Sequence, residues 1–166
     1  MAQNTMTEKD AFLQAFEREF QTTLKVLKAY PPAKSELKPA EKSKPARELA
    51  WMLVLNQMVL VPTLEGKLEP GSLPPAPKDW SDLVAALEKA HRETTVRLQG
   101  ATDAELNGVI PIPTGPKQMG QMRIGDALWF FLNDTIHHRG QFSIYLRMAG
   151  GKLPSIYGPT ADEPWF

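Results

Sequence analysis

Cysteine is absent from this chain of 166 residues. Without thiols the protein cannot form disulfides, thiolate zinc sites or a cysteine nucleophile. Any metal ion must therefore be bound by His, Asp, Glu, Met or amide side chains, and the chain has only three histidines. The placement of these few histidines decides which metal-dependent functions the sequence allows.

Net charge is absent too, because 19 basic residues balance 19 acidic ones. A neutral chain has no general attraction to nucleic acid or to an anionic membrane. No apolar run approaches the roughly 20 residues that a bilayer span needs, and residues 1–9 lack the apolar stretch of a signal peptide. We expect a soluble, cytoplasmic protein with neither a nucleic-acid nor a membrane partner.

Strand signals are absent, whereas apolar residues recur at three- and four-residue steps, the spacing of helices that bury one face. Proline and glycine separate the helical stretches. Four helices are predicted: Glu8 to Tyr30 with Thr7 as its N-cap, Pro45 to Val61 ended by Pro62, Ser81 to Gln99 with Ser81 as its cap, and Arg123 to Met148.

The segments between the helices are rich in proline, and we interpret residues 31–44 and 62–79 as connections. Residues 103–106 are expected to form one short turn, and residues 149–166 an extended tail. A connection as long as 62–79 is typical of a crossover between distant helices. The sequence therefore predicts one all-α domain over residues 1–166, a four-helix bundle with a long crossover connection.

The last helix carries the most reactive side chains. A projection at about 100° per residue places His138 at the centre of an apolar face, with Asp134 about 40° away on the same face. A carboxylate and an imidazole spaced i and i+4 can serve as two metal ligands. The alternative is a hydrogen-bonded core histidine, although an inward carboxylate then needs a donor or a cation. His137 falls on the flank of the helix.

Four other residues are candidates to complete such a site. On the second helix Met52 projects inward, and Glu48 and Asn56 lie one turn on either side of it. On the third helix His91 shares an apolar stripe. Core roles are the favoured interpretation for Met52 and His91, with metal ligation as the alternative.

A second apolar strip on the last helix consists of Trp129, Leu132 and Ile136. A bundle buries one face of each helix, so a second strip indicates an additional cover. We expect a homodimer.

Two motifs resemble those of the DinB/YfiT-like family of bacterial four-helix bundles. The stronger is His137-His-Arg-Gly-Gln141 followed by Gly150-Gly-Lys-Leu-Pro-Ser-Ile-Tyr157, and the weaker is Glu48-Leu-Ala-Trp51. The resemblance implies a divalent metal, usually nickel or zinc, held by three histidines. These positions correspond to Met52, Asp134 and His138 here, and only His138 keeps the histidine. Asp134 remains a competent ligand for zinc or manganese, whereas a methionine is a poor one.

The resemblance also implies a function, a metal-dependent transferase or isomerase that uses a low-molecular-weight thiol. A metal with an open coordination position can activate such a thiol as a nucleophile. Two alternatives stay open. One is a non-catalytic dimeric bundle that binds a small apolar ligand or a protein partner, since a methionine makes a pocket more apolar and adaptable. The other is a dimer with a purely structural role.

The remaining polar residues of the signature have two interpretations. Arg139 and Gln141 can orient His138, or they can bind the returning tail near Ser155 and Tyr157, the role we favour. In the tail, Tyr157, Asp162 and Glu163 can close a pocket or pack the chain end.

Overall fold

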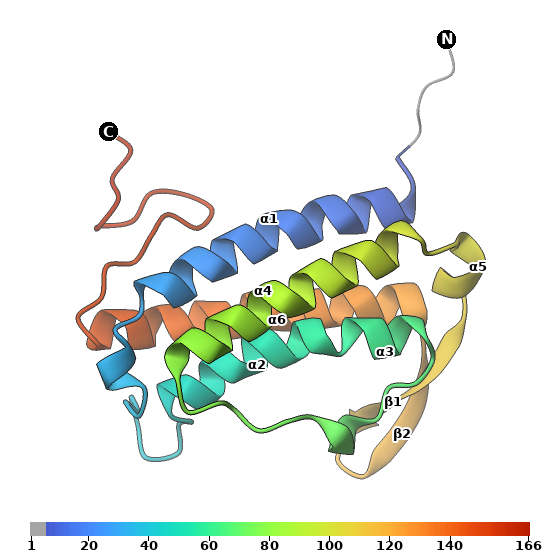
Figure 1. Ribbon diagram of the computed structural model, residues 1–166, viewed down its shortest axis with the longest axis horizontal. Helices are drawn as coiled ribbons and strands as arrows, with labels where there is room; N and C mark the ends of the chain where they lie inside the picture. The colour runs from blue at the N-terminus through green and yellow to red at the C-terminus, as the bar shows by residue number, and fades with distance from the viewer. Residues whose placement is uncertain (1–5) are drawn as a thin grey trace.

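Four long helices lie side by side in the protein, whose computed structural model describes residues 6–166 (Figure 1). Helices α1 and α2 each pack against α4 and α6. The predicted four-helix bundle is confirmed. Residues 1–5, part of the segment expected to lack a signal peptide, lie outside the described residues. The four helices are α1 (Glu8–Ala29), α2 (Ala46–Met58), α4 (Trp80–Gln99) and α6 (Ile124–Met148).

The chain crosses the length of the bundle between α2 and α4, as predicted. Residues 65–79 return from the far end of α2 to its starting end, with one 3-10 turn, η2 (Pro70–Ser72), on the way (Figure 1). Because of this crossover, α2 and α4 run in the same direction. The connection between α1 and α2 contains the short η1 (Pro32–Lys34). Among the described residues, no helix is long and apolar enough to cross a membrane.

Local capping fixes two of the helix starts. The Thr7 hydroxyl accepts a hydrogen bond from the Asp10 amide at 3.1 Å, and the Asp10 carboxylate accepts one from the Thr7 amide. Thr102 and Glu105 form the same reciprocal pair at the start of α5 (Asp103–Leu106). Each pair satisfies amides that a helix start leaves without partners.

Helix α4 begins at Trp80 and not at Ser81, with Asp79 in the cap position. The Trp80 indole donates a hydrogen bond to the Leu27 carbonyl at 3.0 Å and stacks against Tyr30 at 4.7 Å between ring centres. Contacts to α1 thus set the first turn of α4 in place of a side-chain cap.

The predicted end of the second helix at Pro62 is wrong. Helical structure continues through α3 (Leu60–Leu64), with a break at Val59 between the two helices. A proline has no N–H to offer the carbonyl four residues earlier, here that of Met58, and its ring crowds that carbonyl. Pro62 therefore interrupts the helix one turn before itself and is accommodated in the first turn of α3.

The expectation that the chain has no strands is also wrong. Strands β1 (Val109–Gly115) and β2 (Gln118–Arg123) form an antiparallel hairpin. Ile110 and Ile112 point into the core, whereas Pro111 and Pro113 are exposed. Both strands of a two-stranded sheet are edges, where a missing proline N–H is tolerated. The prolines that indicated an irregular segment thus occupy the outer positions of a strand.

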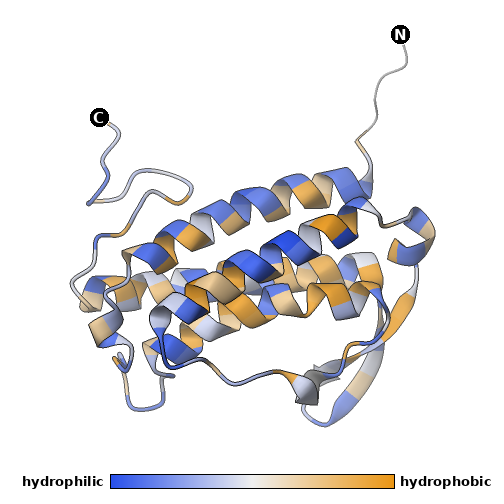
Figure 2. Ribbon diagram, viewed as in Figure 1, coloured by the Kyte–Doolittle hydropathy of each residue, from blue (hydrophilic) through white to orange (hydrophobic). Residues whose placement is uncertain are grey.

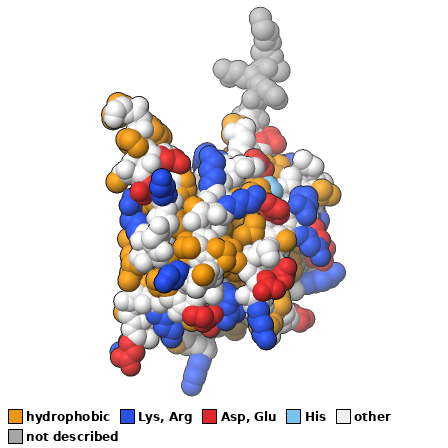
Figure 3. All heavy atoms as spheres, turned by 60° about the vertical axis from the view of Figure 1, so that its left-hand side comes forward, with side chains coloured by type: hydrophobic (Ala, Val, Ile, Leu, Met, Phe, Trp, Pro, Cys, Tyr) orange, Lys and Arg blue, Asp and Glu red, His pale blue; other side chains and the backbone are white. Residues whose placement is uncertain are grey.

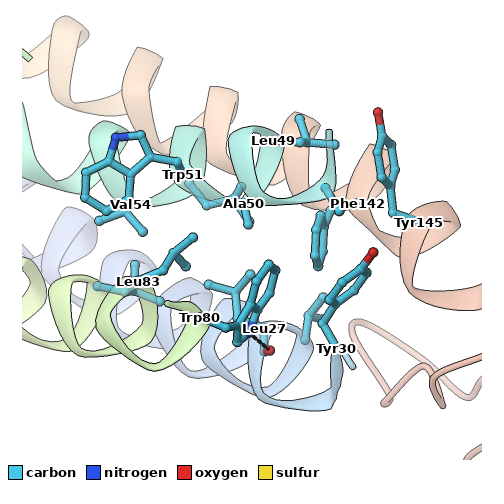
Figure 4. Close-up of a cluster of buried hydrophobic side chains, with 14 of the residues drawn as sticks. Leu27, Tyr30, Leu49, Ala50, Trp51, Val54, Trp80, Leu83, Phe142 and Tyr145 are labelled. Atoms are coloured by element: carbon cyan, nitrogen blue, oxygen red, sulfur yellow. Dashed lines mark hydrogen bonds between the residues drawn. The ribbon is translucent and has the colours of Figure 1, made fainter. Parts of the chain in front are cut away.

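Two apolar clusters fill the bundle, one toward each end. In the first, rings from α1, α4 and α6 stack on one another beside aliphatic side chains of α2 (Figure 4). The second lies toward α3 and the hairpin, and Figure 2 shows the hydrophobic colouring of α2, α3 and β1 on that side. Charges are interspersed on the face seen in Figure 3, where basic and acidic side chains alternate. The second cluster includes Phe12, Phe16, Leu60, Leu64, Leu98, Ile110, Ile124, Leu128 and Leu132.

The buried face of α6 differs from the predicted one. Its centre is the line of Leu128, Leu132, Thr135, Arg139 and Leu146, and His138 lies at its margin with a side chain 20% exposed. The supposed second strip belongs to the same face, because Leu132 is in the core. Trp129 packs edge-on against Phe12 of α1, at 5.2 Å between ring centres. The strip that motivated a homodimer is therefore covered largely within the chain.

A buried ion pair joins α1, α6 and the tail. The Arg139 side chain is 1% exposed and the Glu19 side chain 2%, and their charged groups lie 2.7 Å apart. Arg139 also donates to the Thr23 hydroxyl at 3.1 Å. The Tyr157 hydroxyl donates to Glu19 at 2.7 Å and accepts from Arg139 at 2.6 Å. The favoured role of Arg139, binding the returning tail, is confirmed.

Burial by itself raises the pKa of Glu19, but the hydrogen bonds from Tyr157 and Arg139 and the charge of Arg139 outweigh it, so the pKa of this carboxyl is lowered. The tail reaches this position because the chain turns just after α6 at Gly150, whose φ of +80° favours glycine. Asp162 then accepts a hydrogen bond from the Leu153 amide and pairs with Arg147 at 3.0 Å. The acidic residues of the tail thus pack the chain end.

We predict that removing one partner of the buried pair destabilises the fold strongly. Arg139→Met or Glu19→Gln should lower the free energy of unfolding by about 3–5 kcal/mol, because the remaining group stays buried without its partner. The double variant Glu19→Gln/Arg139→Met should lose less than the sum of the single losses. Tyr157→Phe, which removes one hydroxyl, should cost about 1 kcal/mol. Denaturant unfolding measures the stability of all four variants. A loss in the double variant equal to the sum of the two single losses would contradict an interaction between Glu19 and Arg139.

Candidate functional site

Asp134 and His138 lie together on the side of α6 that faces α2. The Nε2 atom of His138 is 3.2 Å from Oδ2 of Asp134, as the spacing of four residues predicts. The His138 side chain is 20% exposed and the Asp134 side chain 31%, so both are accessible from solvent. The pair lies at the rim of the bundle, in the groove between α2 and α6, and not in its centre as the projection suggested.

Asn56 is the residue of α2 that joins the pair. Its side-chain amide donates to Oδ2 of Asp134 at 2.8 Å, and Asn56 itself is buried. Met52, one turn earlier, is half-buried in the same helix, and Glu48, two turns earlier, is exposed. Of the candidates to complete a site, the structure therefore brings Asn56 to Asp134 and leaves Glu48 in solvent.

Gln141 links the two histidines of the signature. Nδ1 of His138 lies 3.1 Å from Oε1 of Gln141, and Nε2 of Gln141 lies 3.0 Å from Nε2 of His137. His137 is exposed, as its place on the flank predicts. Both ring nitrogens of His138 thus have a polar neighbour, the Asp134 carboxylate at Nε2 and the hydrogen-bonded Gln141 amide at Nδ1, and the two together fix the orientation of the ring. Gln141 takes the orienting role that was the alternative for it.

A hollow of about 440 Å³ opens beside His138 and Gln141. Its walls include Lys44 and Tyr145, and the Tyr145 hydroxyl donates to the Lys44 carbonyl at 2.9 Å. This bond ties the segment before α2 to the last turns of α6, so it supports the wall next to the Asp134–His138 pair. A small polar molecule in this hollow would touch His138 directly.

The donor set fits two coordination positions of a divalent cation. Two ligand atoms about 2.1 Å from one ion lie roughly 3.0–3.4 Å apart at tetrahedral or octahedral angles, and the Asp134–His138 distance of 3.2 Å agrees with this. The third ligand position is occupied by Met52, whose thioether is a poor ligand for these ions. Within residues 6–166, no group of three or more His, Asp or Glu side chains could hold a metal ion together. The residues fit a cation held by two protein donors and water, and not a three-histidine site.

His91 lies in a different interface. It is buried between α4 and α1, where its ring stacks on Phe20 at 3.6 Å and on Phe16 at 4.7 Å between centres. Its Nε2 bonds Glu17 at 2.8 Å. Burial lowers the pKa of His91, and the neighbouring Glu17 carboxylate offsets part of that decrease. The favoured interpretation of His91 as a core residue agrees with these contacts.

Comparison with known proteins supports the four-helix fold and the resemblance of the sequence motifs described above. The sequence model of the DinB family matches residues 1–164. A segment of 43 residues is 44% identical to the uncharacterized protein YrdA of Bacillus subtilis (strain 168). That segment covers 26% of this chain and 26% of YrdA, so the chain aligns with about a quarter of that curated relative.

Three solved structures share the arrangement of helices. A DinB-like protein from Bacillus cereus ATCC 10987 has a TM-score of 0.74 at 24% identity, covering 89% of this chain and 97% of that one. The DinB-like protein YjoA from Bacillus subtilis has a TM-score of 0.71 at 19% identity, covering 94% and 99%. YfiT from Bacillus subtilis, described as a probable metal-dependent hydrolase with an unusual four-helix bundle topology, has a TM-score of 0.66 at 14% identity, covering 90% and 93%. At these identities the likeness shows a common fold.

We predict that His91 makes the fold less stable in mild acid. Because burial lowers its pKa, the unfolded chain takes up a proton on this ring more readily than the folded protein. The free energy of unfolding should therefore fall as the pH falls below the ordinary histidine value of 6.5. His91→Phe keeps an aromatic ring in the stack and should flatten this dependence between about pH 7.5 and about pH 5. His137→Ala, at an exposed position, should keep the wild-type slope; equal slopes in the wild type and His91→Phe would contradict the assignment.

Proposed function

We propose, since this chain belongs to the DinB family, that the groove between α2 and α6 is the site of a metal-dependent enzyme in which Asp134 and His138 hold a divalent cation. The observation that supports this most is the separation of their donor atoms, 3.2 Å, in a groove open to solvent. A carboxylate and an imidazole at this distance share one ion readily. Zinc, nickel or manganese is the expected class of metal.

Two further contacts prepare the pair for a cation. Asn56 holds one carboxylate oxygen of Asp134, and Gln141 holds the far ring nitrogen of His138. Residues that hydrogen-bond a metal ligand in this way fix the orientation of the ligand before the ion binds. Because the ring also contacts Asp134 through Nε2, a bound cation would replace that contact and leave both ligands oriented.

The chemistry that a bound cation supplies is activation of a nucleophile, because a cation with an open position lowers the pKa of a bound water or thiol. Two reaction types use this step. YfiT, with the same fold, is described as a probable hydrolase, which makes water the nucleophile there. The sequence resemblance implies a low-molecular-weight thiol. The hollow lined by Lys44, Gln141 and Tyr145 has room for either nucleophile and for the polar part of a substrate.

We predict that the untagged protein binds zinc, nickel or manganese through this pair. Saturating cation at about 100 times the dissociation constant should stabilise the fold by about 2.7 kcal/mol. Asp134→Ala and His138→Ala should abolish the increase in melting temperature. His137→Ala removes a neighbouring histidine outside the pair and should keep it. Calorimetric titration gives the affinities; no binding by the wild type, or equal binding by His138→Ala, would refute the proposal.

The two nucleophiles can be distinguished on the cobalt(II)-substituted protein. A thiol that binds the ion as thiolate produces a charge-transfer band in the near ultraviolet, and water does not. A thiol-dependent transferase should show this band on addition of a low-molecular-weight thiol, and His138→Ala should not. A site that uses only water would give no band at any thiol concentration.

The second candidate function is a non-catalytic bundle that binds a small apolar ligand. The observation that favours it is Met52, a half-buried thioether where the family pattern has a histidine. On this account the natural protein binds no cation, and Met52→His creates an affinity that the wild type lacks. On the metal-dependent account Met52→His adds a third ligand to an existing pair, so it raises an affinity that is already measurable. The wild-type titration therefore decides between them.

A homodimer and a cytoplasmic location stay predictions. Helix α6 carries exposed apolar side chains, Phe130 at 49%, Ile144 at 56% and Met148 at 52%, and the first two line the hollows beside the candidate site. Exposed large apolar side chains are typical of a surface that a second copy can cover. We predict a dimeric mass by light scattering at micromolar concentration, reduced to a monomeric mass by Ile144→Asp. A monomeric wild type would refute the dimer without affecting the cation proposal.

A further inference from the structure

An apolar hollow of about 270 Å³ lies next to the candidate site, toward α3. Two of its lining residues flank the Asn56–Asp134 hydrogen bond: Val59 follows Asn56 by three residues, and Phe131 precedes Asp134 by three. Since a helix rises 1.5 Å per residue, these walls lie about 4.5 Å along each helix from the bond. The hollow therefore continues the groove in which Asp134 and His138 lie.

Segments distant in the sequence converge to form this hollow. Beside the two bundle helices, the crossover contributes Leu73 and the hairpin contributes Ile112 and Pro113. Figure 1 shows the crossover and the hairpin meeting at this end of the bundle. Every residue that lines the hollow is apolar, so nothing in its wall offers a side-chain hydrogen bond. The crossover and the hairpin thus build a common wall against α6.

Large apolar side chains are exposed around the opening. Phe130 is 49% exposed and Leu73 is 38% exposed. Water in a concave apolar space is released favourably when an apolar group enters. An apolar cavity of about 150 Å³ is enough to bind benzene. The larger hollow here accommodates one substituted ring or a short alkyl chain.

The geometry points to this hollow as the binding site for the apolar part of the substrate, a single aromatic ring or short alkyl chain. A group seated there directs its polar, reactive end along the groove, toward Asp134 one helical turn away and His138 two turns away. This inference names the substrate class of the proposed site and rests on the proposed function for the reactive end. Binding of the apolar group needs no cation, which lets the two ideas be tested separately.

The probe is n-hexanol, titrated into the metal-free, full-length protein. Saturable shifts of the amide signals of Val59, Ile112 and Phe131 in nitrogen–proton spectra are expected, together with a rise in melting temperature. The matched ligand is 1,6-hexanediol, which has the same chain and a second hydroxyl. It should bind about fivefold more weakly or worse, because a hydroxyl in the hollow finds no partner. Equal affinity for both probes, or no saturable shifts, would overturn the assignment.

The matched variants are Leu73→Trp and Met148→Ala. The first adds volume at the rim, in an irregular segment that tolerates substitution, and should weaken n-hexanol binding about tenfold or more. The second removes a similarly exposed apolar side chain of α6 outside the hollow, and should leave n-hexanol binding unchanged. Equal weakening by both variants would show that the probe binds apolar surface in general.

Cation binding provides the remaining readout. His138→Ala should lose the cation and keep n-hexanol, whereas Leu73→Trp should keep the cation and lose n-hexanol. If the wild type binds n-hexanol at this hollow and no cation, the proposed metal-dependent function fails and the apolar site stands. If it binds the cation and no n-hexanol, the substrate class assigned here is refuted and the proposed function is untouched.

Discussion

The buried ion pair between Glu19 and Arg139 is the constraint on which the arrangement of α6 depends. An arginine with 1% of its side chain exposed is tolerated only beside a partner, and here Glu19, Thr23 and Tyr157 surround it. Consecutive residues on a helix point about 100° apart. Because Arg139 points toward α1, the preceding residue, His138, must face the groove beside α2. The same contact that ties the tail to the bundle therefore sets the direction of the candidate site.

This constraint explains why the fold was easier to predict than the faces of its helices. Helix positions follow from local signals such as the Thr7 cap and the three- and four-residue spacing of apolar residues, and these were confirmed. The buried face of α6 depends on Glu19, which lies on another helix, so periodicity alone placed His138 too deep and did not identify Arg139 as a buried residue. The hairpin escaped detection because Pro111 and Pro113, ordinarily signs of irregular chain, stand on the outer side of an edge strand.

The candidate site shows the same division between local and tertiary information. The contact of Asp134 with His138 follows from their spacing on one helix, and the sequence was sufficient to predict it. Choosing among Glu48, Asn56 and His91 required the packing of different helices. His91 is held between Phe16 and Phe20 at the α1–α4 interface, whereas Asn56 reaches Asp134 across the α2–α6 groove. The apolar hollow could not be foreseen, because its walls come from the crossover and from a hairpin that was not predicted.

The crossover topology connects these features. Since α2 and α4 run in the same direction, residues 65–79 must return along the bundle, and on the way they place Leu73 against the end of the α2–α6 groove. The groove is thus closed by apolar side chains at one end, while its polar atoms are concentrated at Asn56, Asp134 and His138. With a thioether at Met52, an ion held there has two protein donors and several exchangeable positions. In such a site, coordination alone selects poorly among small molecules that bind metal. In the enzyme proposed above, discrimination among substrates would then come from the apolar hollow, where the size of a ring or chain decides how well it fits.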